Sequence, residues 1–167
     1  SFNNDDLVDF SDYRIPIATR LTSNSGTYSG NVQGLQSANG NNDVAFSNIE
    51  IHVGGQTAED FFQGVDSLAE WTIDQTSGSN SNYVSDVSND GDLTDDRLGP
   101  PEGEFRNFEI IRGGAGNDEF IIVGTQAVNL LGGGGNDTFT FRDGASITGA
   151  LDGMFGVDQI VYSAYTT

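Results

Sequence analysis

The sequence predicts an all-β protein: a parallel β-roll or β-solenoid with glycine-rich turns, and more irregular β structure in its N-terminal part. Three observations carry this prediction. Glycine contributes 23 of the 167 residues, about twice its usual share. Short apolar runs recur along the chain between clusters of turn-forming residues, as strands do. Two six-residue stretches, 113–118 and 132–137, have nearly the same sequence and lie 19 residues apart.

The N-terminal part, residues 1–104, is the more divergent. Residues 6–21 alternate apolar and polar side chains and predict two short strands, the second made irregular or placed at a sheet edge by Pro16. Residues 22–43 and 74–104 are polar, and a polar stretch as long as the second is usually a functional or disordered loop. Further strands are expected at 44–46, 49–51, 61–62 and 71–73.

The C-terminal part, residues 105–167, has more regular strand signals and continues the same domain. Apolar or alternating runs return there at short intervals, each preceded by glycine, aspartate or asparagine. The strands are expected at 105–112, 119–123, 127–131, 138–142, 146–151 and 159–164.

The two repeated stretches both read GGxGND and both precede a strand-like run. A third copy, Gly153 to Asp158, follows 21 residues after the second. It keeps two glycines and the aspartate, and we expect Asp152 to stand in place of the first glycine. One motif every 19 to 21 residues predicts one motif per coil, all on one side, so that successive turns stack about 4.8 Å apart.

These turns resemble the hemolysin-type calcium-binding repeat, or RTX, family, whose nonapeptide is G-G-x-G-x-D-x-U-x. The resemblance implies that Ca²⁺, which prefers oxygen ligands, binds between stacked turns 113–118 and 132–137, and again between 132–137 and 153–158. The implied ligands are carboxylates and backbone carbonyl groups. They belong to Gly113, Ala115, Asp118, Gly132, Gly134, Asp137, Gly153 and Asp158.

A second candidate calcium site lies in the polar stretch at 86–92. Asp86, Ser88, Asp90 and Asp92 place oxygen atoms at alternate positions, and Gly91 follows at the sixth position, as in the first half of an EF-hand loop. Position twelve is Arg97 instead of glutamate, so a solvated acidic loop is the alternative reading.

Two longer internal alignments extend the repeat pattern. Residues 46–55 match 105–114 at an offset of 59, which makes 54–59 a degenerate turn copy and sets His52 on a strand face. At an offset of 152, residues 6–13 match 158–165. The end of the chain therefore resembles the start of another copy, and head-to-tail contact between neighbouring copies is expected.

Composition excludes several classes of function. The net charge of −19 argues against nucleic acid and anionic membranes as partners. There is no cysteine, and no apolar run is long enough to span a membrane. No nucleophile or nucleotide-binding motif occurs, so we expect no enzymatic activity.

We therefore expect a calcium-binding structural or adhesive module of a secreted or cell-surface protein, folded and rigidified by Ca²⁺. Two alternatives stay open. One is an accessory module of a secreted polysaccharide-active enzyme or protease, which carry similar repeats. The other is a carbohydrate-binding domain, with Trp71 and Tyr83 as stacking platforms for surface glycans.

Overall fold

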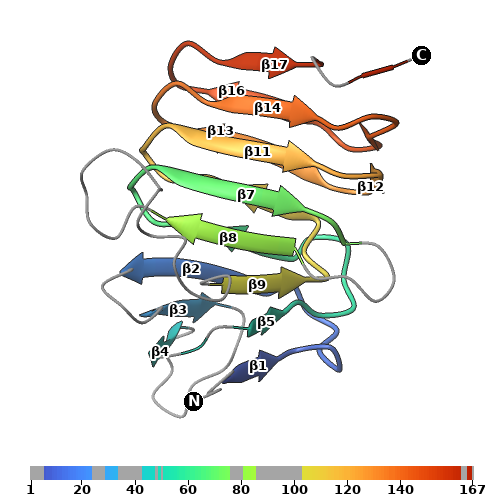
Figure 1. Cartoon of the computed structure of the whole chain (residues 1–167). Coiled ribbons are helices and arrows are strands. Elements are labelled where there is room, and N and C mark those ends of the chain that lie inside the picture. Colours follow the sequence, from blue (N-terminus) through green and yellow to red (C-terminus); the bar gives the residue numbers. More distant parts are fainter. Residues whose placement is uncertain are drawn as a thin grey trace, which may run out of the picture.

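The computed structural model shows an all-β chain, as predicted (Figure 1). It describes residues 6–23, 29–33, 43–47, 49, 51–75, 81–85, 103–162 and 165–166. Within these ranges every regular element is a strand, and none of them forms a helix that could cross a membrane.

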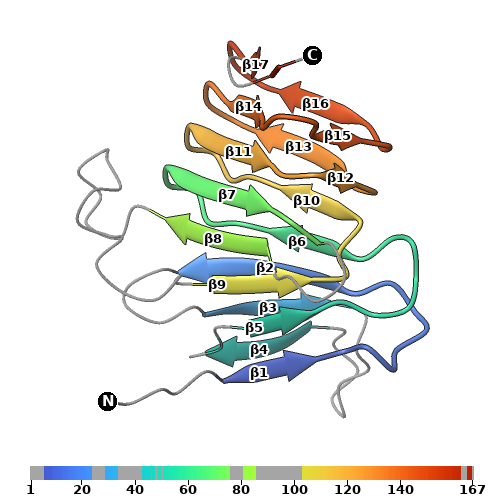
Figure 2. The same cartoon turned by 45° about the vertical axis from the view of Figure 1, so that its right-hand side comes forward.

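Two large sheets face each other across the core (Figures 1 and 2). Sheet A has the strand order β1-β5-β9-β8-β7-β11-β14-β17, and sheet B has the order β16-β13-β10-β6-β2-β3-β4. The short pair β12-β15 forms sheet C. The N-terminal strands are β1 Leu7–Asp9, β2 Ala18–Ser23, β3 Ser29–Gln33, β4 Asp43–Ser47, β5 Ile51–Val53, β6 Phe61–Gln63, β7 Ala69–Ile73 and β8 Ser81–Ser85. The others are β9 Gly103–Arg106, β10 Ile110–Arg112, β11 Asp118–Ile122, β12 Thr125–Gln126, β13 Asn129–Gly133, β14 Thr138–Phe141, β15 Ser146–Ile147, β16 Leu151–Met154 and β17 Gln159–Val161.

The C-terminal strands repeat one path, which we call a rung: a strand of sheet B, a turn, and a strand of sheet A. The pairs β10–β11, β13–β14 and β16–β17 are three successive rungs, and β6–β7 lies next to the first of them (Figure 2). All neighbouring rungs pair in parallel. Sheet C carries the chain back from sheet A to sheet B between these rungs.

Parallel pairing in register places similar side chains above one another. Phe120 of β11 lies opposite Trp71 of β7 and Phe139 of β14. Its ring is stacked on both, with centroids 5.6 Å from Trp71 and 5.0 Å from Phe139. All three side chains are fully buried, together with Ile111 and Leu130 from the facing sheet B. The stacked rings of sheet A thus form an aromatic column in the core.

The N-terminal part interrupts this regular path. The antiparallel pairs among the described strands are β2–β3, β3–β4, β7–β8 and β8–β9, all between residues 18 and 106. Strand β8 lies between β7 and β9 in sheet A, so the chain leaves the regular path after β7 and rejoins it at β10. Strands β3 and β8 fall within stretches that the sequence did not divide into strands.

The alignment at offset 59 is wrong in the structure. His52 pairs with Phe105 and not with Ile111. The reason is that β5 belongs to sheet A whereas β10 belongs to sheet B. The segment after β5 therefore crosses from sheet A to sheet B, while the turn at 113–117 crosses from sheet B to sheet A, and the two occupy different edges.

His52 lies on a strand face, as expected, and is buried between two rings. Its imidazole centroid is 5.0 Å from Phe46 and 5.4 Å from Phe62. Burial lowers the pKa of His52 to about 4, so the ring is neutral at pH 7 and acts as part of the core.

The aromatic column yields a first prediction. Phe120→Ala removes a buried ring that packs against neighbours on both sides, and we expect it to lower the free energy of unfolding by about 3–5 kcal/mol. Phe155 is 72 % exposed, so Phe155→Ala is the matched control and should change stability by no more than about 0.5 kcal/mol. Urea unfolding in a chelator measures both variants, and equal losses would contradict the assigned packing.

Candidate metal centre

The three motif turns lie side by side on one edge of the molecule. The register sets Gly113, Gly132 and Gly153 in one row, because Leu131 pairs with Arg112 on one side and with Asp152 on the other. Likewise Glu119, Thr138 and Gln159 pair in register, which sets the preceding aspartates in a second row. We call Asp118, Asp137 and Asp158 the aspartate row.

Each carboxylate of the aspartate row contacts the neighbouring rung. The backbone N–H of Asp118 donates to Oδ1 of Asp137 at 2.8 Å, and the N–H of Asp137 donates to Oδ1 of Asp158 at 2.9 Å. Asp118 itself closes its own turn, where Oδ2 accepts from the N–H of Gly114 at 3.0 Å. These contacts leave Oδ2 of Asp137 buried without a hydrogen-bond partner, whereas the Asp118 carboxylate also interacts with the Trp71 side chain and the Ala69 backbone.

The first glycine of each turn makes room for these carboxylates. A Cβ atom on Gly113 would collide with Oδ2 of Asp118 and with the carbonyl oxygen of Gly132 in the next turn. A Cβ atom on Gly132 would likewise meet Oδ2 of Asp137 and the carbonyl oxygen of Gly153. Glycine is required here because carboxylate and carbonyl oxygens from two adjacent turns converge on the space that a side chain would fill.

The third turn differs from our sequence alignment in one position. Gly153 lies opposite Gly132, and Met154 lies opposite Gly133, so Met154, and not Asp152, replaces a motif glycine. Met154 has a φ of 67° where Gly133 has 114°. A left-handed conformation is costly for a residue with a side chain, so the neighbouring turn holds Met154 in a conformation that glycine would adopt more easily.

Burial and mutual repulsion raise the pKa values of Asp118 and Asp137. Burial, followed by the charge of Asp137, raises the pKa of Asp118 to about 8. Burial also raises the pKa of Asp137 to about 6, with a contribution from Asp158. Carboxylates with raised pKa values are ionised at a cost, and a cation placed between them would remove that cost.

The residues of this edge fit a hard divalent cation. Oδ2 of Asp137, which has no hydrogen-bond partner, lies next to the carbonyl oxygen of Gly153, and Oδ2 of Asp118 lies next to that of Gly132. Ca²⁺ takes six to eight such oxygens. Among the residues that the structure describes, no three His, Cys, Asp or Glu side chains form a metal cluster. The row explains this, because it supplies one carboxylate per rung, so that an ion between two turns meets only two of them and needs carbonyl oxygens as well.

The remaining predicted ligands lie in two places. Ala115 and Gly134 are adjacent across the turns, at the more exposed end, with the Ala115 carbonyl oxygen 3.5 Å from where a Cβ on Gly134 would stand. The second candidate site, with Asp86, Ser88, Asp90 and Asp92, falls outside the described residues.

The motif asparagines, to which the sequence gave no role, form a second ladder. Oδ1 of Asn117 accepts from the N–H of Asn136 at 2.7 Å, and Oδ1 of Asn136 accepts from the N–H of Val157 at 2.8 Å. Each side chain satisfies a backbone donor one rung away, which ties neighbouring turns together. The sequence signal that could have predicted this ladder is the identical position of the two asparagines in the two motif copies.

A second acidic pair, which the sequence did not single out as a site, lies at a different edge. Asp60 and Glu109 directly precede β6 and β10, where the chain crosses from sheet A to sheet B. Oε2 of Glu109 accepts from the N–H of Asp60 at 3.2 Å. Burial raises the pKa of Glu109 to about 7, and the charge of Asp60 adds to the increase.

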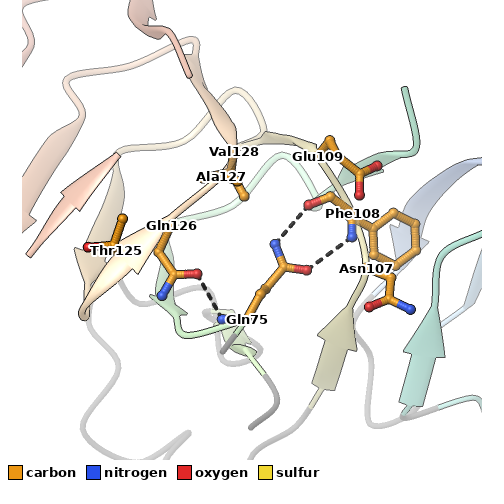
Figure 3. A pocket seen from close by; sticks show the side chains of 8 residues that line it. All are labelled: Gln75, Asn107, Phe108, Glu109, Thr125, Gln126, Ala127 and Val128. Carbon is orange, nitrogen blue, oxygen red and sulfur yellow. Dashed lines mark hydrogen bonds between the residues drawn. The ribbon is translucent and has the colours of Figure 1, made fainter. Parts of the chain in front are cut away.

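A pocket of about 220 Å³ lies beside Glu109 (Figure 3). The side chain of Gln75 lines it and binds both backbone groups of Phe108, at 2.7 and 3.0 Å. The N–H of Gln75 donates to Oε1 of Gln126 at 3.0 Å. In Figure 3 the carboxylate of Glu109 points away from these amides. The polar groups of the pocket thus mainly join Gln75, which follows β7, to Phe108 before β10 and to Gln126 of β12.

The proposed sugar platforms are not available for stacking. Trp71 and Tyr83 are both fully buried, and their rings pack on each other with centroids 4.3 Å apart. The reading of these two residues as glycan-stacking platforms is therefore wrong, because large aromatic side chains on β7 and β8 point into the core.

Comparison with protein-family models, with curated proteins and with solved structures yields no match.

The raised pKa values predict how stability depends on pH in a chelator. Asp118 and Asp137 have higher pKa values in the folded chain than in the unfolded one, so their contribution is complete below about pH 4 and is lost as the pH rises toward 8. We expect Asp118→Asn to flatten this decline and to melt above the wild type at pH 8. Thermal unfolding between pH 4 and 8 measures it, and parallel pH profiles for the two proteins would refute the assignment.

Proposed function

We propose that this chain is a calcium-stabilised parallel β-roll, a structural or adhesive module of a secreted or cell-surface protein. The observation that carries the proposal is the aspartate row, in which Oδ2 of Asp118 and Oδ2 of Asp137 converge with backbone carbonyl oxygens of the next turn. Of these two oxygens, Oδ2 of Asp137 is buried without a hydrogen-bond partner. The in-register parallel rungs with glycine-rich turns on one edge support the β-roll architecture. The resemblance of the turns to the RTX repeat points to the same ion.

The proposed ligands divide between two positions. Asp118 and Asp137, with the carbonyl oxygen of Gly132, would hold one ion, and Asp137 and Asp158, with the carbonyl oxygen of Gly153, would hold the other. A bound Ca²⁺ supplies positive charge that compensates the stacked carboxylates. Binding to the folded chain alone adds its free energy to stability.

The same chemistry favours an extracellular location. Extracellular calcium modules typically have Kd values of about 10⁻⁴ to 10⁻³ M, and they fill only where the ion is abundant. A net charge of −19 destabilises a compact chain through self-repulsion. In this proposal the chain is less stable at low calcium and gains stability and rigidity after export.

A calcium titration tests the proposal. At 10 mM Ca²⁺ each site should add about 1–3 kcal/mol of stability for a Kd in the extracellular range, which raises the Tm by several degrees. Asp137→Asn should remove most of this gain, because Asp137 belongs to both sites. The exposed Asp143 lies in another turn, so Asp143→Asn is a charge-matched control and should keep it. A wild-type Tm and circular dichroism spectrum that calcium leaves unchanged would sink the proposal.

The two ends of the described chain support an array of copies. Strands β1 and β17 are the opposite edges of sheet A (Figure 1), and the described residues that follow each of them share a hydrogen bond and a ring contact. The N–H of Tyr13 donates to the carbonyl of Phe10 at 2.7 Å, and the N–H of Tyr165 donates to that of Tyr162 at 2.9 Å. Both aromatic pairs are edge-to-face, with centroids 5.6 and 5.7 Å apart. The match at offset 152 is therefore also a match of local structure.

The last rung leaves apolar side chains uncovered, which gives such an array a contact surface. Phe155 is 72 % and Val157 81 % exposed, and Ile160, which extends the Phe120–Phe139 column, is 49 % exposed. We propose that the N-terminal end of a second copy covers this surface and continues the sheets. A contact between unlike ends does not close, so it produces linear assemblies.

Sedimentation velocity tests the head-to-tail contact. We expect concentration-dependent association in Ca²⁺, which the double substitution of Phe155→Asp and Val157→Asp abolishes. Thr125 is also exposed but lies on sheet C, so Thr125→Asp should leave association unchanged. A wild type that stays monomeric at high concentration would rule out this contact.

A further inference from the structure

The acidic pair at the second edge repeats the hydrogen-bond pattern of the aspartate row. Ile17, Asp60 and Glu109 precede Ala18, Phe61 and Ile110, which are neighbours in register in sheet B. Oδ1 of Asp60 accepts from the N–H of Ile17 at 2.8 Å, and Oε2 of Glu109 accepts from the N–H of Asp60 at 3.2 Å. As in the aspartate row, each carboxylate binds a backbone donor of the adjacent strand.

Asp60 is fully buried, but its hydrogen bonds satisfy only one of its two carboxylate oxygens. Its relative exposure is 0 %. Oδ1 accepts from Ile17 and also from the hydroxyl of Thr57 at 3.0 Å. Oδ2 is buried without a hydrogen-bond partner. An ionised carboxylate in this position is costly unless a cation or a further donor reaches the second oxygen.

The unpartnered oxygen faces a space lined by other oxygen atoms. A Cβ built on Gly55 would lie 3.3 Å from Oδ2 of Asp60 and 3.0 Å from the carbonyl oxygen of Tyr13. Next to it, the carbonyl oxygen of Asn107 packs so closely on Gly54 that no side chain fits there. Asn107 is held in the left-handed conformation, with a φ of 59°. Gly54 and Gly55 on one segment, and Asn107 on another, thus allow carbonyl oxygens to lie close to the buried carboxylate of Asp60.

We propose that this edge is a second divalent-cation site, in which Asp60 and Glu109 supply carboxylates and Tyr13 supplies a carbonyl oxygen. Two carboxylates with neutral oxygen ligands suit Ca²⁺ better than a transition metal, which would favour nitrogen or sulfur. The site joins three segments, 10–17, 54–60 and 107–109, that are far apart in the sequence. It uses none of the GGxGND residues, so it does not depend on the ions proposed for the aspartate row.

The substitution Asp60→Asn tests the site because asparagine keeps Oδ1 as an acceptor for Ile17 and Thr57, removes the charge and replaces Oδ2 with an amide NH2 group. By calorimetric titration with Ca²⁺, we expect the variant to bind one ion fewer than the wild type. In a chelator it should melt at or above the wild type, and in 10 mM Ca²⁺ below it. Glu59 is exposed and adjacent, so Glu59→Gln is the charge-matched control and should keep the full number of ions.

Two further variants separate this site from the aspartate row and from a folding defect. Asp137→Asn should lose row ions and keep the Asp60 ion, so the two proposals can fail independently. Glu109→Gln, at a half-buried position, should weaken one ion at least tenfold even if Asp60→Asn does not fold. The proposal is overturned if the Asp60 and Glu109 variants both bind as many ions as Glu59→Gln with unchanged affinity, or if Asp60→Asn folds and gains as much Tm from calcium as that control.

Discussion

The parallel, in-register pairing of successive rungs is the constraint on which the rest of this structure depends. It places each residue one strand spacing from the equivalent residue of the next rung. Equivalent side chains therefore form columns in which neighbours contact each other. For Phe120 and Phe139 the result is favourable, because stacked rings bury each other. For Asp118 and Asp137 it is unfavourable, since like charges are brought together out of water. The same geometry thus builds the core and creates the demand for a cation.

Glycine and asparagine in the turns follow from that constraint. A turn that stacks on identical turns has no room for side chains where Gly113 and Gly132 face carboxylates of their own turns and carbonyls of the next. It also leaves backbone donors that only a neighbouring rung can satisfy, and Asn117 and Asn136 provide the acceptors. The residues of the GGxGND motif are therefore required by contacts between one turn and the next. Two copies at one-rung spacing consequently predict this structure better than a single copy does.

The sequence was sufficient where the repeat is regular and insufficient where it is interrupted. Two motifs 19 residues apart predicted that Asp118 and Asp137 are neighbours, because a fixed spacing and parallel strands leave one register. The alignment at offset 59 was misleading, since it matches β5 of sheet A with β10 of sheet B. Asp60 could not be assigned from sequence, because its contacts come from Ile17 and Glu109, 43 and 49 residues away.

The positions of the two chain ends have a mechanical consequence. The N-terminal strand β1 and the C-terminal strand β17 lie at opposite ends of the stack (Figure 1), so tension between the ends runs along the hydrogen bonds that join neighbouring strands. Such loading peels rungs off one after another, in contrast to shearing, which breaks many bonds at once. An ion held between two turns would act as a clip against peeling, and the force needed to extend the chain would then depend on the calcium concentration around it.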